Sequence, residues 1–170
     1  MAFVTLNDVR GIGDPLRIYN YDLVITEPPG ATANGQVLRI SNTNTSIPGV
    51  GVESFESNHH GHTLKHPGRG IHPRTLTAEY EERSNGIVLT TLRAWRELAW
   101  NTETGAQAVS ADLKVDGFLE LYDTEENLIK TIRIRGMYVE DIADTPLDGA
   151  TSDSVKVTVT FSYDNTIDEG

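Results

Sequence analysis

The sequence contains no cysteine, which excludes disulfide bonds and thiolate chemistry. No stretch approaches the roughly 20 consecutive apolar residues that a membrane-spanning helix needs, and residues 1–15 have neither the basic nor the apolar region of a signal peptide. These absences predict a soluble protein that makes no contact with a membrane and is made in a reducing cytoplasm. At 170 residues, the chain is most simply one domain, residues 1–170, able to bury roughly 70% of its unfolded surface.

Basic residues are scarce. The chain has 14 Lys and Arg against 25 Asp and Glu, and the net charge of −11 argues against a protein that binds nucleic acid by neutralising phosphates. The charge is also uneven, because residues 59–100 hold six basic and four acidic residues, which leaves eight basic and 21 acidic residues elsewhere. A basic segment on an acidic body suits head-to-tail contact between copies, although simple solvation explains the pattern equally well.

Several segments alternate apolar and polar side chains, which is the pattern of a half-buried β-strand. The clearest is residues 154–164, where Val155, Val157, Val159, Phe161 and Tyr163 alternate with polar residues. The other predicted strands are residues 17–25, 36–40, 74–82, 112–123 and 130–139. The chain is therefore predicted to be mainly β.

Only one segment has a convincing helical period. In residues 86–101 the apolar side chains recur every three to four residues and polar side chains occupy the opposite face. Ser84 or Asn85 can cap the start of this helix, while Trp100 falls off its apolar stripe. Residues 1–15 have no periodicity and are predicted to form an N-terminal arm.

All five histidines fall within residues 41–73, a segment rich in Asn, Ser, Thr, Gly and Pro. Inside it, residues 49–55 and 62–66 alternate well enough to pair as a hairpin across residues 56–61. A long structureless excursion would be unusual in a compact domain unless it were functional. The segment is therefore predicted to be an extended hairpin loop.

The histidines could form a metal site, a pH switch or a polar surface that meets another copy. His62 and His66 have a spacing that zinc sites allow, but the neighbouring Gly61 and Pro67 exclude the helix that would bring both rings to one point. His60 and His62 resemble the first metal motif of cupin barrels, yet no glutamate follows where that motif requires one. Imidazole in general titrates near neutrality, but nothing else in the sequence asks for a switch.

Catalytic motifs are absent from the sequence. It has no G-x-G-x-x-G, no G-x-x-x-x-G-K and no G-x-S-x-G, and it lacks a cysteine nucleophile. We therefore predict no enzymatic activity, no cofactor and no metal. A metal-dependent enzyme that uses the histidine-rich loop remains the alternative from another functional class.

The order of these segments resembles the tail tube proteins of contractile-tailed bacteriophages. The resemblance lies in an arm that leads into a first strand (residues 7–25) and a strand that runs into the helix (residues 75–100). It continues through a strand with Gly136 (residues 129–148) to the sharply alternating residues 154–164. It rests on collinear organisation and length, because no single short motif is diagnostic.

The resemblance implies a small β-barrel or sandwich with one flanking α-helix and a long hairpin loop. Hexameric rings of this subunit would stack into the inner tube of a phage tail, in a virion assembled in the bacterial host cytoplasm. The implied partners are identical subunits, the tail sheath, the tape measure, the baseplate and the tail terminator. DNA would pass through an acidic lumen without specific binding, because like charges repel.

The resemblance also implies contact roles for individual residues. The contacts between subunits and rings are expected from His59, His60, His62, Lys65, His66, Arg69, His72 and Arg74, acting as polar contacts, with the acidic residues 140–153 as their complement. The helix would face the sheath with Arg93, Arg96, Glu97 and Trp100. The candidates for the lumen are Arg133, Arg135, Lys156 and Thr158.

The same subunit physics would serve the tube of a phage-like contractile injection system, such as a tailocin or a type VI-like device. The sequence leaves both readings open.

Overall fold

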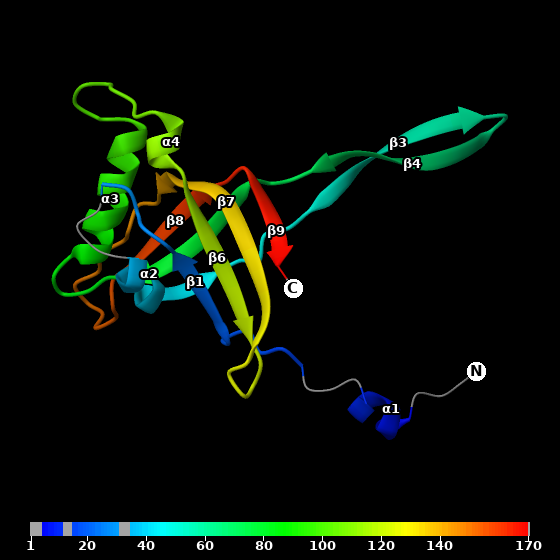
Figure 1. Ribbon diagram of the computed structural model, residues 1–170, viewed down its shortest axis with the longest axis horizontal. Coiled ribbons are helices and arrows are strands. Elements are labelled where there is room, and N and C mark those ends of the chain that lie inside the picture. Colours follow the sequence, from blue (N-terminus) through cyan, green and yellow to red (C-terminus); the bar gives the residue numbers. More distant parts are fainter. Residues whose placement is uncertain (1–4, 12–14, 31–34, 170) are drawn as a thin grey trace.

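The computed structural model describes residues 5–11, 15–30 and 35–169 (Figure 1). The helices are α1 (Leu6–Gly11), α2 (Gly35–Ser41), α3 (Ile87–Ala99) and α4 (Ser110–Leu113). The strands are β1 (Tyr21–Ile25), β2 (Asn42–Thr45), β3 (Gly51–His59), β4 (His62–Ile71), β5 (Thr75–Glu81), β6 (Val115–Tyr122), β7 (Leu128–Ile142), β8 (Lys156–Ser162) and β9 (Asn165–Glu169). Within these ranges no helix is long and apolar enough to cross a membrane.

Seven of the strands form one antiparallel sheet in the order β1-β6-β7-β8-β5-β2, with β9 paired to β7. The long strand β7 joins two leaves of this sheet. Its first part pairs with β6 and β9, and its last part pairs with β8. We call β1, β6, β9 and the first part of β7 the first leaf, and β2, β5, β8 and the last part of β7 the second leaf.

The two leaves meet at a bulge around Gly136, where the register between β6 and β7 shifts. Gly136 has φ 65°, a left-handed conformation that residues other than glycine rarely adopt. An added Cβ at this position would lie 2.2 Å from an Asp164 carboxylate oxygen. Glycine therefore allows β7 to turn from the first leaf into the second. Strand β9 pairs with β7 before the turn, and β8 pairs with it after the turn.

A carboxylate from the neighbouring strand holds this bulge. Asp116 Oδ1 accepts a hydrogen bond of 3.1 Å from the Gly136 amide, and Asp116 Oδ2 accepts bonds of 2.7 and 3.1 Å from the Arg133 guanidinium. The hydrogen bonds from Arg133, and then that from Gly136, lower the pKa of Asp116 from its ordinary value despite partial burial. The charged form of Asp116 is thus the one that stabilises the bend.

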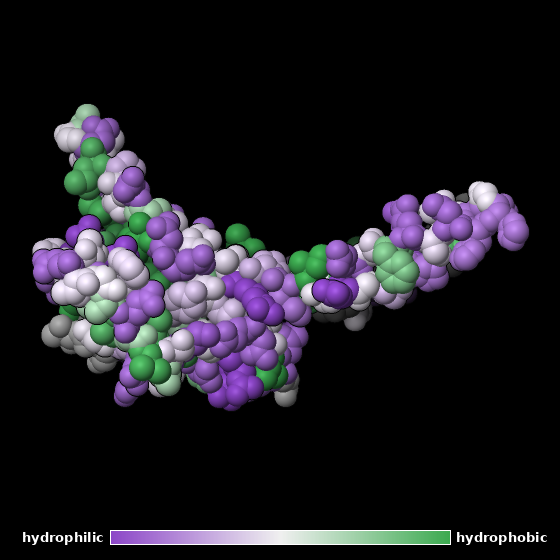
Figure 2. Space-filling view, turned by 90° about the horizontal axis from the view of Figure 1, so that it is seen from above, coloured by the Kyte–Doolittle hydropathy of each residue, from purple (hydrophilic) through white to green (hydrophobic). Residues whose placement is uncertain are grey.

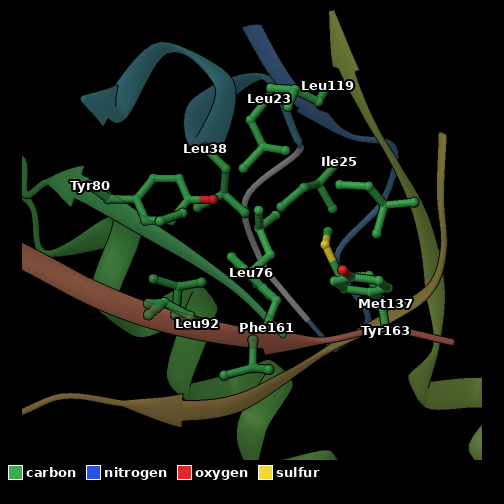
Figure 3. Close-up of a cluster of buried hydrophobic side chains, with 14 of the residues drawn as sticks. Leu23, Ile25, Leu38, Leu76, Tyr80, Leu92, Leu119, Met137, Phe161 and Tyr163 are labelled. Atoms are coloured by element: carbon green, nitrogen blue, oxygen red, sulfur yellow. The ribbon is translucent and has the colours of Figure 1, made fainter. Parts of the chain in front are cut away.

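The hydrophobic core lies between the two leaves, where Leu23, Ile25 and Leu119 point toward Leu76, Tyr80 and Phe161 (Figure 3). This arrangement confirms the predicted alternation, since the inward side chains of β5, β6 and β8 are buried and their neighbours are not. Val155, predicted on the apolar face, differs, because it precedes β8 and is 39% exposed, and the predicted strand 17–25 begins only at Tyr21.

Helix α3 flanks the leaves and fills the core beside β8, and its presence confirms the predicted helix. Val88, Leu92 and Trp95 are fully buried. The Trp95 ring packs 5.7 Å from that of Phe161, and its Nε1 donates a 2.9 Å hydrogen bond to the buried Leu113 carbonyl. The indole thereby ties α3 to the start of β6, which follows α4.

The first turn of α3 is capped mainly from outside the helix. The Glu82 carboxylate, at the end of β5, accepts hydrogen bonds from the amides of Val88 (3.1 Å) and Leu89 (2.6 Å). Asn85 Oδ1 accepts from the Ile87 amide at 3.3 Å, as its position in the sequence suggested. A negative charge at the helix N-terminus also complements the helix dipole.

The sheet is not closed into a barrel, since in the described residues no pairing joins β1 to β2. Helix α2 covers part of this opening. The prediction of a strand at residues 36–40 was wrong, because Leu38 and Ser41, one helical turn apart, are both buried, and Arg39 forms an ion pair with Asp22 of β1. Five alternating residues do not distinguish a short strand from a short helix.

The prediction of a single helix was also wrong, since the described residues contain α1, α2 and α4 besides α3. Helix α1 lies within the predicted arm, of which residues 1–4 and 12–14 fall outside the described ranges. The predicted hairpin is confirmed: β3 and β4 pair as a two-stranded ribbon that projects from the body (Figures 1 and 2).

Replacing Gly136 by alanine tests the bend. We expect Gly136→Ala to lower the free energy of unfolding by about 2 kcal/mol or more, because left-handed strain of about 1–2 kcal/mol adds to the displacement of Asp164 from its ion pair with Lys114. Urea denaturation measures the loss. Gly86→Ala is the matched control, since Gly86 has φ 66° but no atom within 4 Å of an added Cβ. Equal losses in both variants would show that Asp164 does not constrain the bend.

Removing the charge of Asp116 tests its role in holding the bulge. Because the pKa of Asp116 is lowered in the folded protein, its stabilisation is present above pH 3.8 and is lost as the pH falls below that value. We expect Asp116→Asn to cost about 1 kcal/mol at pH 7 and to approach the stability of the unsubstituted protein near pH 2. Urea midpoints from pH 2 to 7 measure this, with Asp153→Asn, in an exposed loop, as the control. A cost that stays constant across this pH range would contradict the assignment.

Candidate interaction surfaces

The β3–β4 ribbon has two chemically different faces. Directly opposed residues of an antiparallel pair share a face, and so do alternate residues along each strand. The register pairs Phe55 with His66, Ser57 with Leu64 and His59 with His62. These six residues form what we call the aromatic face of the hairpin.

Contacts within the aromatic face hold its largest ring in place. The Phe55 ring stacks on the His66 ring at 5.2 Å between centroids, and Ser57 Oγ lies 2.9 Å from His66 Nε2. Phe55 and Leu64 are nevertheless more than half exposed, at 56% and 51%. This face therefore presents ordered apolar surface to solvent.

The opposite face of the ribbon is polar, and its side chains pair with one another. Lys65 pairs with Glu56 at 3.5 Å, and Thr63 Oγ1 donates a 2.6 Å hydrogen bond to Asn58 Oδ1. The ribbon is thus amphipathic, with charges on one side and rings on the other.

The predicted interface residues lie along this hairpin and at its exit, but they share no single face. His59, His62 and His66 belong to the aromatic face, whereas Lys65 lies on the polar one. His60 forms the turn with φ 48°. The exposed Arg69 lies in β4 where the register shifts, and the exposed His72 and Arg74 follow that strand. Within the described ranges, no three His, Cys, Asp or Glu side chains are placed to hold a metal ion.

Sequence reasoning singled out the basic and histidine side chains and missed Phe55 and Leu64. The sequence does contain the alternating pattern that includes them, because both occupy alternate positions of the two segments that were predicted to pair. Which side chains share a face with them could be identified only once the register was known, since a shift of one residue moves every side chain of a strand to the other face.

The outward side of α3 borders a cleft of about 740 Å³ opposite residues 141–147. Arg93 lines this cleft and is exposed, and Trp100, at the end of the helix, is half exposed. Arg96 and Glu97 also line it but pair with each other at 2.9 Å. These four predicted sheath-facing residues therefore lie on one helix and its end.

Glu97 is held by the loop that follows α3. Its carboxylate accepts hydrogen bonds from the Thr102 hydroxyl (2.6 Å) and the Thr102 amide (2.9 Å). These bonds lower the pKa of Glu97 from its ordinary value, with a smaller contribution from Arg96. The Glu97 carboxylate is therefore fixed in position at the cleft and charged at neutral pH.

The four predicted lumen residues fall into two pairs on different leaves. Arg133 and Arg135 lie on the first part of β7, whereas Lys156 and Thr158 lie on β8 in the second leaf. Because the core separates the leaves, the outer faces of the two leaves look toward different sides of the molecule. The structure does not bring the two pairs together.

The outer faces of the leaves also differ in chemistry. On the second leaf, Thr77 lies opposite Thr160, Glu79 opposite Thr158, and Lys156 forms a 3.0 Å ion pair with Glu79. The first leaf carries partly exposed aromatic side chains between its charges. One of them, Tyr122, donates a 2.6 Å hydrogen bond to Glu120, which raises the pKa of Tyr122 to about 12.

No protein-family model matches this sequence, and no curated protein sequence matches it. Solved structures do match its fold. A chain in the sheath/tube terminator structure of an extracellular contractile injection system, PVC, superimposes with a TM-score of 0.69 at 15% identity, over 94% of this chain and 99% of that chain. A chain in the PVC sheath–tube complex gives 0.65 at 14% identity, over 98% and 99% of the two chains.

A chain in the tube-terminating cap of the anti-feeding prophage also gives a TM-score of 0.65, at 13% identity over 92% of each chain. All these identities are too low to show more than the fold. The coverage is nearly complete in both directions, so the likeness in fold spans most of the chain. The resemblance to contractile tail tube proteins is confirmed at the level of the fold: this chain is built as the tube components of contractile injection particles are.

Proposed function

We propose that this protein is a structural subunit of a contractile phage tail, in which hexameric rings stack into the inner tube. It conducts DNA, serves as the scaffold for the sheath and catalyses no reaction. The observation that carries the proposal is the amphipathic β3–β4 hairpin. Of its strand residues only Ser57 and His66 are partly covered, and every other one is exposed.

A two-stranded hairpin is at best marginally stable in water unless it packs on something else. The ribbon projects away from the body (Figure 1). Its aromatic face is exposed, with Phe55 and Leu64 more than half accessible to solvent. Identical subunits supply the missing contact in a homopolymer. The hairpin residues His59, His60, His62, Lys65, His66, Arg69, His72 and Arg74 then contact neighbours within and between rings.

The sheet also has free strand edges. Within the described ranges, β1 and β2 are unpaired with one another, and β9 has β7 as its one partner. Exposed edges are a liability for a soluble monomer, and pairing between subunits removes it. Edge pairing around a ring therefore fits this sheet.

We assign the lumen to the outer face of the second leaf. Along β5 and β8 that face is polar, with threonines, Ser162 and the Glu79–Lys156 pair, and a hydrated bore requires such a surface. This assignment retains Lys156 and Thr158 as lumen residues and leaves Arg133 and Arg135 on the other side of the core. The net charge of −11 disfavours adhesion of DNA in transit.

The side of α3 is assigned to the sheath, through Arg93, Arg96, Glu97 and Trp100 beside the cleft of residues 141–147. The tape measure would occupy the lumen, and the baseplate and the tail terminator would bind the two ends of the tube. The assembled particle is a virion formed in the bacterial host cytoplasm.

A second candidate is the tube of an extracellular contractile injection system. The structural matches favour it, since they come from PVC and anti-feeding prophage particles. Subunit contacts are the same in both cases and the cargo differs. Genes for a capsid and a terminase beside the gene for this protein would identify the phage.

Negative-stain electron microscopy of the purified protein tests the proposal directly. At high concentration we expect hollow cylinders or annuli with six-fold symmetry, because the uncovered hairpin and the strand edges require identical neighbours. Analytical ultracentrifugation of the same samples measures the oligomeric state. A compact monomer at every concentration would contradict the proposed function.

Deleting residues 57–66 removes the end of the hairpin without touching the core. We expect a folded subunit with an unchanged thermal unfolding midpoint that no longer polymerises. Circular dichroism is the control for folding, and electron microscopy reads out assembly. Long tubes formed by the deleted protein would show that the hairpin is dispensable for stacking.

A further inference from the structure

The opening between β1 and β2 is only partly covered. Helix α2 closes one part through Leu38, which is fully buried. The remaining part is a groove of about 180 Å³, which we call the seam groove. Its apolar lining consists of Leu16, Ile18, Tyr21, Ile47, Leu119 and Leu121.

The floor of the seam groove belongs to the core. Leu119 and Leu121 are buried inward-facing residues of β6, whereas the walls are exposed, with Ile18 at 93% and Ile47 at 59%. Apolar surface costs roughly 25 cal/mol per Å² while it remains in water. An apolar groove that is built on core residues and walled by exposed aliphatic side chains is suited to receive an apolar group.

The hairpin carries a group of matching size and chemistry. A cavity of about 150 Å³ lined by aliphatic side chains is known to hold one benzene ring, and the seam groove, at about 180 Å³, is of that size. Phe55 is an aromatic residue of the ribbon that is more than half exposed, and its ring stacks on that of His66. Leu64, beside it on the same face, can rest on the groove wall.

Phe55 does not reach the seam groove of its own chain in this structure. The ribbon extends away from the body, whereas β1 and the segment before it lie on a different side (Figure 1). Two paired strands of nine and ten residues form a ribbon roughly 30 Å long that would have to fold back on itself. The occupant must therefore come from another copy.

We propose that the aromatic face of the hairpin docks into the seam groove of a second copy, with the Phe55 ring as the inserted group. This inference rests on the proposed function and names the contact by which the subunits join. The contact is heterologous, because the hairpin and the seam groove are different surfaces, so each subunit still offers a hairpin to a further copy. Such contacts generate rings or filaments rather than closed dimers.

The absence of cysteine makes disulfide trapping unambiguous. The chain with Phe55→Cys and Ile18→Cys, assembled and then mildly oxidised, is expected to give a ladder of covalent oligomers that reductant collapses to monomer. Mixing the two single variants should give covalent dimers and no larger species. The control pairs Ile18→Cys with Asn58→Cys, which lies on the polar face of the ribbon and should give no ladder.

A second variant measures how much the Phe55 side chain contributes to assembly. We expect Phe55→Ala to raise the concentration at which rings form by about tenfold or more, as truncation of a buried aromatic anchor does. Asn58→Ala, on the polar face, should leave that concentration unchanged. Thermal unfolding of both variants verifies that the core is intact.

The outcomes separate this inference from the proposed function. Tubes seen by microscopy without a ladder from the Phe55→Cys chain, or an equal ladder from the Asn58→Cys chain, would overturn the docking and leave the tube in place. A disulfide formed within one chain would overturn it too, since the groove would then hold its own hairpin. Failure to assemble under any condition would remove the proposed function and the docking together.

Discussion

The fold depends on one bend in one strand. β7 can belong to both leaves only because Gly136 takes a left-handed conformation. The Asp116 carboxylate holds the resulting bulge by accepting a hydrogen bond from the Gly136 amide. If β7 ran straight, its pairing with β6 and with β8 would place all seven strands in one flat sheet, and the inward side chains would have no layer to pack against. The bend turns that sheet back on itself, so that Leu23 and Ile25 meet Leu76 and Phe161 in one core.

A sheet folded in this way has a seam, and the seam is where the subunit is incomplete. Helix α2 fills part of it and leaves an apolar groove, while the chain between β2 and β5 extends outward as the hairpin. The surfaces that the single chain leaves unsatisfied are thus of complementary kinds, an apolar groove and an amphipathic ribbon. In a protein built to stay monomeric, such surfaces would be covered or charged.

The histidines take on a modest role in this arrangement. His66 supports the Phe55 ring, and His59 and His62 continue the same face toward the turn. Their chemistry is that of polar aromatic rings on a contact surface, and their spacing along an extended ribbon keeps them from converging on one point. The lumen candidates are separated for a different reason, since they lie on strands of different leaves, whose polar sides face in different directions.

The sequence by itself determined the strands of the core, the α3 helix and the existence of the hairpin, because each follows from periodicity within a single segment. The two-residue period of residues 154–164 and the helical period of residues 86–101 needed no partner to be read. The prediction for residues 36–40 was wrong because it also depended on local periodicity, and five residues are too few to show a period. Only the tertiary structure decided the register of the hairpin, the separation of Arg133 from Lys156 and the groove at the seam. These are relations between segments far apart in the chain, which hydrogen bonding across the sheet and the turn at Gly136 fix, and no local pattern encodes them.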